Sequence, residues 1–102
     1  MNYFKVVSEI VCSEIRNLIE EGKLVSDLNL GQVGVETTKD PVHGDLASNA
    51  AMVLAKPAKK SPKELGEIIV DRLLKRSEFE LVSLAGPGFI NLKMVPKFWT
   101  RL

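Results

Sequence analysis

The sequence has 102 residues, the size of one small domain, and we expect a single domain over residues 1–102. No apolar run approaches the roughly 20 residues that a membrane span needs, and one cysteine excludes an internal disulfide. The net charge of +1 hides an asymmetry, because residues 1–51 hold four basic and eight acidic side chains whereas residues 52–102 hold ten and five. We therefore expect a polyanionic partner to prefer the second half, and a solvated basic helix face is the alternative.

An amphipathic helix is predicted near the N-terminus. Apolar residues recur there at steps of three and four, at Phe4, Val7, Val11, Ile15 and Leu18. Gly22 should end the helix, because glycine adopts the left-handed conformation without a steric penalty. After a polar connection, residues 33–37 alternate between apolar and polar types, which predicts a short half-buried strand.

A loop and two helices are predicted in the middle of the chain. Residues 39–45 are rich in turn formers, and we expect Asp45 to cap a helix that begins at Leu46 and ends at Pro57. The segment Ser61-Pro62-Lys63-Glu64 has the pattern of a capping box, with proline at the first helical position. A further helix should therefore begin directly after Ser61.

A β-hairpin is predicted next. Residues 81–85 and 88–94 form its strands, because the run Gly86-Pro87-Gly88 would break any helical period. In the second strand the side chains should alternate between two faces. Ile90, Leu92 and Met94 are expected on one face, with Phe89, Asn91 and Lys93 on the other.

A last helix should begin at Pro96, and the sequence ends at Leu102 after about two turns of it. Helices this short are marginal on their own, so we interpret the chain as a piece of a longer protein. The order of elements predicts an α+β fold, with a small, mostly antiparallel sheet packed against several amphipathic helices.

The sequence offers little for catalysis. His43 and Cys12 are its only histidine and cysteine, so no zinc site of four Cys or His ligands can be built within one chain. The apolar neighbours of Cys12 favour packing in a helix, and a structural hydrogen bond explains His43 better than a catalytic triad does. We expect no catalytic residue, no metal ligand and no cofactor in this segment. A small enzyme built on His43 is the least favoured alternative.

A candidate RNA-binding surface lies near the end of the chain. Its five residues are Asn91, Lys93, Lys97, Phe98 and Arg101. Aromatic rings that stack on bases, together with basic side chains for phosphates, are the usual means of holding unpaired nucleotides. Core packing of Phe98 or Trp99 is the alternative, and adjacent helical positions point about 100° apart, so both rings are not expected in one environment.

Two stretches carry a resemblance to a known family. The first is Lys39-Asp40-Pro41-Val42-His43-Gly44-Asp45-Leu46-Ala47-Ser48-Asn49, and the second is Ala85-Gly86-Pro87-Gly88-Phe89-Ile90-Asn91. In this order, with a helix capped at Ser61 between them, they resemble the N-terminal additional domain of arginyl-tRNA synthetases. The resemblance extends over essentially the whole chain.

The resemblance implies a domain that precedes a class I catalytic core and contacts a nucleotide of the D-loop at the elbow of tRNA. The contact maps to Val95-Pro96-Lys97-Phe98, where Phe98 takes the place of an aromatic residue that packs on the base. The family often has Asp or Asn before this proline, and Val95 cannot cap the helix through its side chain. Asn91 falls on the asparagine that ends the AGPGFIN-like run.

The resemblance also implies the activity of the whole enzyme, which would activate arginine with ATP and Mg²⁺ and transfer it to tRNA-Arg in the cytoplasm. Signatures resembling HIGH and KMSKS are absent from these 102 residues. The segment would orient the tRNA, with tRNA-Arg and the enzyme's own catalytic core as partners and no membrane. The alternative is a protein-interaction module that docks a partner through Trp99 and Leu102 of the terminal helix.

Overall fold

The structure, a computed structural model, describes residues 2–38 and 44–101, apart from the side chains of Trp99 and Arg101. It contains the following elements in chain order: α1 (Tyr3–Glu20), the 3-10 helix η1 (Leu30–Gln32), β1 (Val35–Thr37), β2 (Leu46–Ser48), α2 (Ala50–Ala58), α3 (Pro62–Leu73), β3 (Phe79–Ala85), β4 (Phe89–Met94) and α4 (Pro96–Arg101). The five residues 39–43 of the predicted loop lie outside the described residues.

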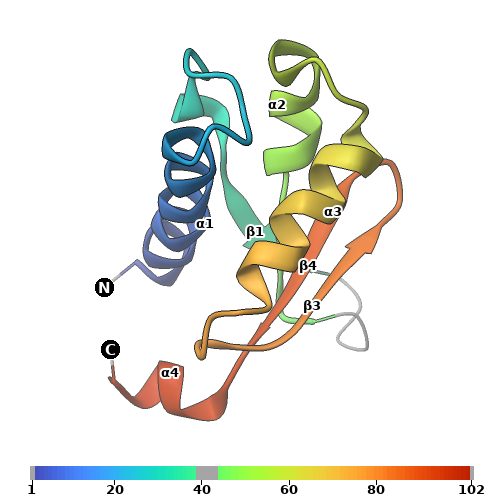
Figure 1. Ribbon diagram of the computed structural model, residues 1–102. Coiled ribbons are helices and arrows are strands. Elements are labelled where there is room, and N and C mark those ends of the chain that lie inside the picture. Colours follow the sequence, from blue (N-terminus) through green and yellow to red (C-terminus); the bar gives the residue numbers. More distant parts are fainter. Residues whose placement is uncertain (1, 39–43, 102) are drawn as a thin grey trace.

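The strands form one sheet in the order β1-β2-β4-β3, and every neighbouring pair is antiparallel. The short strand β2 lies between β1 and β4, so it joins the N-terminal part of the sheet to the C-terminal hairpin. Figure 1 shows α3 lying across β3 and β4, with α2 and α1 beside it. The predicted α+β class and the small antiparallel sheet are therefore confirmed.

One apolar cluster fills the space between the sheet and the helices. Val7, Val11, Ile15 and Leu18 of α1 are buried, as their spacing predicts, whereas Phe4 remains 43% exposed at the start of the helix. From α3 the cluster receives Leu65, Ile69 and Leu73, and from β4 it receives Ile90, Leu92 and Met94. The predicted alternation of β4 is confirmed by these three buried side chains.

The expected helix from Leu46 to Pro57 is wrong at both ends. Residues 46–48 form β2, and α2 begins at Ala50. Leu46 and Ser48 are buried opposite Leu92 and Ile90 of β4, so pairing with two strands outweighs the local signal for a helix. The Asp45 N–H donates to the carbonyl of Leu92 at 2.9 Å, and Asp45 therefore belongs to the entry of the strand rather than to a helix cap.

Pro57 lies inside the last turn of α2, which continues to Ala58. The helix then stops at Lys59, whose φ of 59° and ψ of 39° place it in the left-handed region. The strand predicted over residues 33–37 is limited to β1, because Val33 ends η1. The predicted start of α3 and end of α1 are confirmed. Ser61 caps α3 by accepting the Glu64 N–H at 3.1 Å, Gly22 follows α1 with a φ of 77°, and β3 starts at Phe79, slightly earlier than expected.

Candidate nucleic-acid interface

The short helix α4 continues from β4 and lies at the end of the molecule opposite the α2–α3 connection (Figure 1). Proline suits its first position because a first-turn N–H has no partner inside the helix. The Val95 carbonyl accepts the Phe98 N–H at 2.9 Å, and the Val95 N–H donates to the Glu78 carbonyl at 2.9 Å. These two bonds fix the start of α4 beside the connection between α3 and β3.

Phe98 is 8% exposed and belongs to the apolar cluster, so the packing role that the sequence left open is the one the structure supports. A hollow of about 180 Å³ opens beside it, and we call it the α4 pocket. It is lined by Ser77, Glu78, Val95, Lys97 and Phe98. Stacking of a base on Phe98 stays a prediction, and a base would reach the ring through this pocket.

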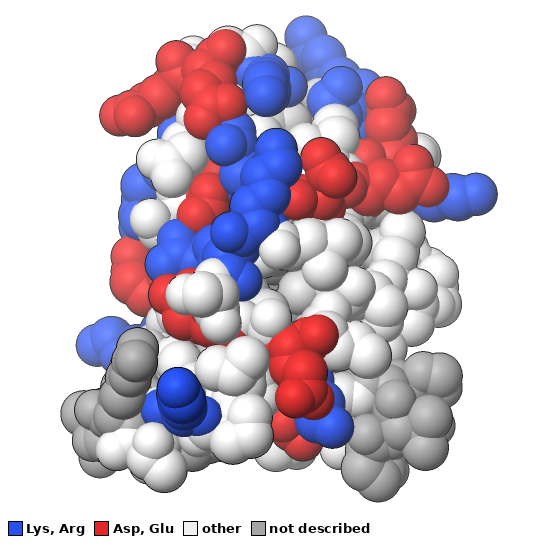
Figure 2. Space-filling model, turned by 60° about the horizontal axis from the view of Figure 1, so that its bottom comes forward, with Lys and Arg blue, Asp and Glu red and all other residues white. Residues whose placement is uncertain are grey.

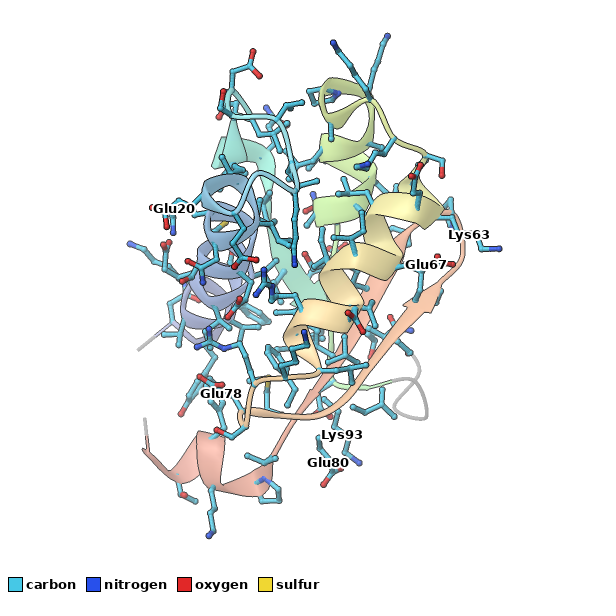
Figure 3. All side chains as sticks on the ribbon, in the orientation of Figure 1. Glu20, Lys63, Glu67, Glu78, Glu80 and Lys93 are labelled. Carbon is cyan, nitrogen blue, oxygen red and sulfur yellow. The ribbon has the colours of Figure 1, made fainter. Side chains whose placement is uncertain are left out.

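The polar groups of the α4 pocket are held in defined positions. Arg76 donates through Nε to Oε1 of Glu78 at 3.1 Å and through Nη2 to Oε2 at 2.9 Å. This hydrogen bonding from Arg76 lowers the pKa of Glu78, so the carboxylate is ionised and its charge is compensated. Figure 3 shows Glu78 above α4 at the end of the α3–β3 connection. Exposed Ser77 and Lys97 add a hydroxyl and an ammonium group.

Asn91 and Lys93 lie on the face of β4 that points away from the buried side chains, as predicted. Lys93 pairs with Glu80 of the neighbouring strand at 3.3 Å (Figure 3). Asn91 is 7% exposed and stands between Ala47 of β2 and Ser83 of β3. Asn91 therefore lies in a central strand of the sheet, where residues of the strands on both sides cover it.

Asn91 borders a different hollow, which has a volume of about 580 Å³ and lies near the turn of the hairpin. This hollow is lined by Glu36, Thr37, Ala47, Ala85, Gly86, Phe89 and Asn91. The structure thus brings Lys97 and Phe98 together in the α4 pocket and separates Asn91 from them. Lys93 lines neither hollow.

Four residues named in the sequence-based predictions cannot be placed. His43 and Leu102 lie outside the described residues, and so do the side chains of Trp99 and Arg101. The alternatives built on them, a docking helix and a small enzyme, stay predictions. Only the backbone of Arg101 is described, in the last turn of α4.

Sequence reasoning missed Ser77 and Glu78 as members of the site. They lie between α3 and β3, far from α4 in the chain, and they reach the pocket because Val95 bonds to the backbone of Glu78. This contact depends on the pairing of β3 with β4, so no local pattern of residue types could have identified it.

Metal and thiol chemistry find no support in the described part of the chain. Within residues 2–38 and 44–101, no group of three His, Cys, Asp or Glu side chains could hold a metal ion. Cys12 is buried, and burial raises the pKa of its thiol, which is the opposite of what a nucleophile needs. None of the helices in this part has the length and apolar character needed to cross a membrane.

Comparisons of the sequence with a family model and with individual proteins point to the same family. Residues 5–94 match the family described as Arginyl tRNA synthetase N terminal domain. The chain is 50% identical over 99 residues to an arginine–tRNA ligase of Parvibaculum lavamentivorans and 43% identical over 101 residues to one of Rhodospirillum rubrum. These alignments cover 97% and 99% of this chain but 17% of each ligase.

Solved structures of the same class share the fold. An arginyl-tRNA synthetase from Plasmodium falciparum superposes with a TM-score of 0.72 at 16% identity, over 93% of this chain and 16% of that protein. The arginyl-tRNA synthetase of Thermus thermophilus gives a TM-score of 0.67 at 19% identity, over 98% and 15%. The chain thus spans about one sixth of the length of the proteins that it matches.

Proposed function

Because the chain belongs to the family of arginyl-tRNA synthetase N-terminal domains, we propose that it contacts the D-loop of tRNA-Arg within an arginine–tRNA ligase. The whole ligase would bind ATP and Mg²⁺ in a catalytic core outside this chain and act in the cytoplasm. There it would join arginine to the 3′ end of its tRNA. This segment contributes no catalytic group, and its task is to orient the tRNA and to recognise part of it.

The observation that carries this proposal is the α4 pocket. The largely buried Phe98, the exposed hydroxyl of Ser77 and the exposed ammonium of Lys97 border one hollow there. A nucleotide that is splayed out of a loop offers a flat face, polar edges and a phosphate, and these features match the three groups in turn.

The two kinds of contact have different consequences. Contacts to phosphate position an RNA without reading its sequence, whereas a base held against an aromatic ring adds selectivity. Lys97 is placed for the first role and Phe98 for the second.

The proposal is tested by replacing Phe98 with leucine and measuring the affinity of the 102-residue chain for tRNA-Arg. Leucine keeps an apolar side chain in the cluster but removes the flat ring. Stacking on one base contributes about 1–3 kcal/mol, so we expect the dissociation constant to rise by roughly 5- to 150-fold. The urea midpoint of the variant is measured in parallel, because Phe98 is buried.

Phe89→Leu is the control for the same change of side chain, since Phe89 is half-buried and borders the hollow of Asn91 instead of the α4 pocket. It should leave the affinity unchanged. If Phe98→Leu folds and binds tRNA like the unmodified chain, Phe98 does not stack on a base. If Phe89→Leu weakens binding instead, the tRNA contacts the outer face of the sheet and the assignment of the α4 pocket is wrong.

A further inference from the structure

Four lysines surround the connection between α2 and α3, and we call them the lysine cluster: Lys56, Lys59, Lys60 and Lys63. Lys60 pairs with Glu64 at 3.8 Å. The other three are exposed, and none of them forms an ion pair with an acidic side chain in the described part of the chain. Figure 3 shows Lys63 extending into solvent at the start of α3, with Glu67 one turn further along the helix.

Two of these lysines occupy positions that local stability disfavours. Lys59 ends α2 in the left-handed conformation, and among the described residues it is the one non-glycine residue with a positive φ. Glycine is the residue that suits this position, because it has no Cβ to strain. Lys63 stands in the first turn of α3, where the helix dipole favours acidic rather than basic side chains. Helix stability therefore does not account for a lysine in place of glycine at position 59, nor for the positive charge of Lys63.

The start of α3, which carries part of the lysine cluster, is held by its cap and by a contact with the hairpin turn. Ser61 and Pro62 fix the start of α3, and Gly88 of the hairpin turn lies so close to Pro62 that a Cβ on Gly88 would be 2.8 Å from the Cβ of Pro62. The backbone of the cluster is thus held against the sheet. Binding then needs little ordering of the backbone that carries these lysines, and its entropy cost falls mainly on the lysine side chains.

The α4 pocket, by contrast, is poor in unpaired cations. Of the predicted contact residues with described side chains, Lys97 is exposed and outside any ion pair, whereas Lys93 is paired with Glu80. Figure 2 shows a band of basic side chains along the middle of the face that it presents, bordered by acidic side chains on either side. A polyanion that reaches the α4 pocket must therefore obtain most of its charge compensation elsewhere.

We propose that the lysine cluster is a second contact with the same tRNA, made to its phosphate backbone without regard to sequence. This inference rests on the proposed function. The cluster and the α4 pocket lie at opposite ends of the molecule (Figure 1), whose longest dimension is 36 Å. A domain of this length can engage one loop nucleotide with the α4 pocket and a separate stretch of phosphate backbone with the lysine cluster.

The test is the salt dependence of tRNA binding by three forms of the 102-residue chain. These are the unmodified chain, the variant Lys56→Gln/Lys59→Gln/Lys63→Gln, and the control Lys5→Gln/Lys23→Gln/Lys75→Gln. The control loses the same net charge from exposed lysines outside the cluster. Each phosphate contact contributes a slope of about 0.7–0.9 to the plot of log affinity against log salt, so the cluster variant should lose about 2–3 of that slope.

At low salt the cluster variant should also bind tRNA at least about tenfold more weakly, whereas the control keeps its slope. Equal slopes for the two variants would overturn the lysine cluster as a contact. If the unmodified chain shows no salt-dependent binding of tRNA at all, that result contradicts both the proposed function and the proposed contact of the lysine cluster. Phe98→Leu separates the two claims, because it should weaken binding and leave the slope unchanged.

A single substitution gives an independent readout. Lys59→Gly relieves the left-handed strain, so the urea midpoint should rise while the affinity for tRNA falls. A rise in stability together with a loss of affinity for tRNA is expected only if the positive charge of Lys59 contacts the tRNA. A variant that gains stability and binds tRNA like the unmodified chain would show that Lys59 contacts no phosphate.

Discussion

Glu14 lies on the buried side of α1 with 7% of its surface exposed, and it meets two arginines there. Arg76 donates through Nη1 to Oε2 of Glu14 at 2.5 Å, and Nε of Arg72 is 3.9 Å from its Oε1. Arg76 also holds Glu78, and Arg72 bonds to Glu21. These pairs tie α1 to α3 and to the segment that borders the α4 pocket.

Arg76→Met should destabilise the fold, because it leaves the Glu14 carboxylate buried with one distant cation. Removing one partner of a fully buried pair costs about 3–5 kcal/mol, and since Arg76 is partly exposed we expect about 2 kcal/mol. Arg16→Met is the control, since Arg16 and Glu9 form an exposed pair worth about 0–1 kcal/mol. Urea unfolding measures both, and equal losses would contradict a structural role for Glu14.

Glu78 makes the stability depend on pH. Its pKa is lowered below the ordinary value of 4.5 by the hydrogen bonds from Arg76. A carboxyl with a lowered folded pKa stabilises the fold at pH values above 4.5, and this contribution is lost as the pH falls through the folded pKa. Glu78→Gln should therefore lower the urea midpoint at pH 6 and have a smaller effect at pH 3. The same effect at both pH values would contradict the pairing.

At the scale of elements, the loop before β2 approaches β4 closely enough to require a glycine. Gly44 has a φ of 121°, and a Cβ on it would lie 2.7 Å from the carbonyl oxygen of Leu92. The next N–H, that of Asp45, donates to that same oxygen. The backbone therefore cannot move away without breaking the junction of β2 with β4.

Gly44→Ala should destabilise the fold by about 2–3 kcal/mol, from backbone strain and the clash with Leu92. Gly34→Ala is the control, because a Cβ on Gly34 meets nothing within 4 Å and its φ is ordinary. The control should be neutral or slightly stabilising in thermal unfolding. If the two alanine variants unfold at the same temperature, the close approach of this loop to β4 is not needed for stability.

The elements that sequence patterns predicted are those with local signals. The spacing of Val7, Val11, Ile15 and Leu18 defines α1, and the oxygen of Ser61 defines the start of α3. The strand β2 escaped prediction because it runs directly into α2, and the pairing that makes it a strand comes from distant segments. The α4 pocket was found in part, through Lys97 and Phe98, whereas Ser77 and Glu78 needed the tertiary fold.

At the scale of the whole molecule, the structure shows where basic residues of the positively charged second half of the sequence lie. Of the ten basic residues in the second half, Arg72 and Arg76 bind carboxylates of α1 and its surroundings, and they serve the fold. Lysines at the two ends of the long axis remain exposed, at the α2–α3 connection and on α4. Part of the positive charge of the second half therefore stabilises the fold through ion pairs, and part of it stays exposed for the proposed contacts with RNA.

The most direct test of the account is a hydroxyl-radical footprint of tRNA-Arg, read at each nucleotide, with the 102-residue chain bound. We predict that nucleotides of the D-loop are protected by the unmodified chain, that Phe98→Leu removes this protection, and that Phe89→Leu leaves it intact. A D-loop that stays fully reactive with the chain bound, or that is protected equally by Phe98→Leu, would contradict the proposed role of the α4 pocket.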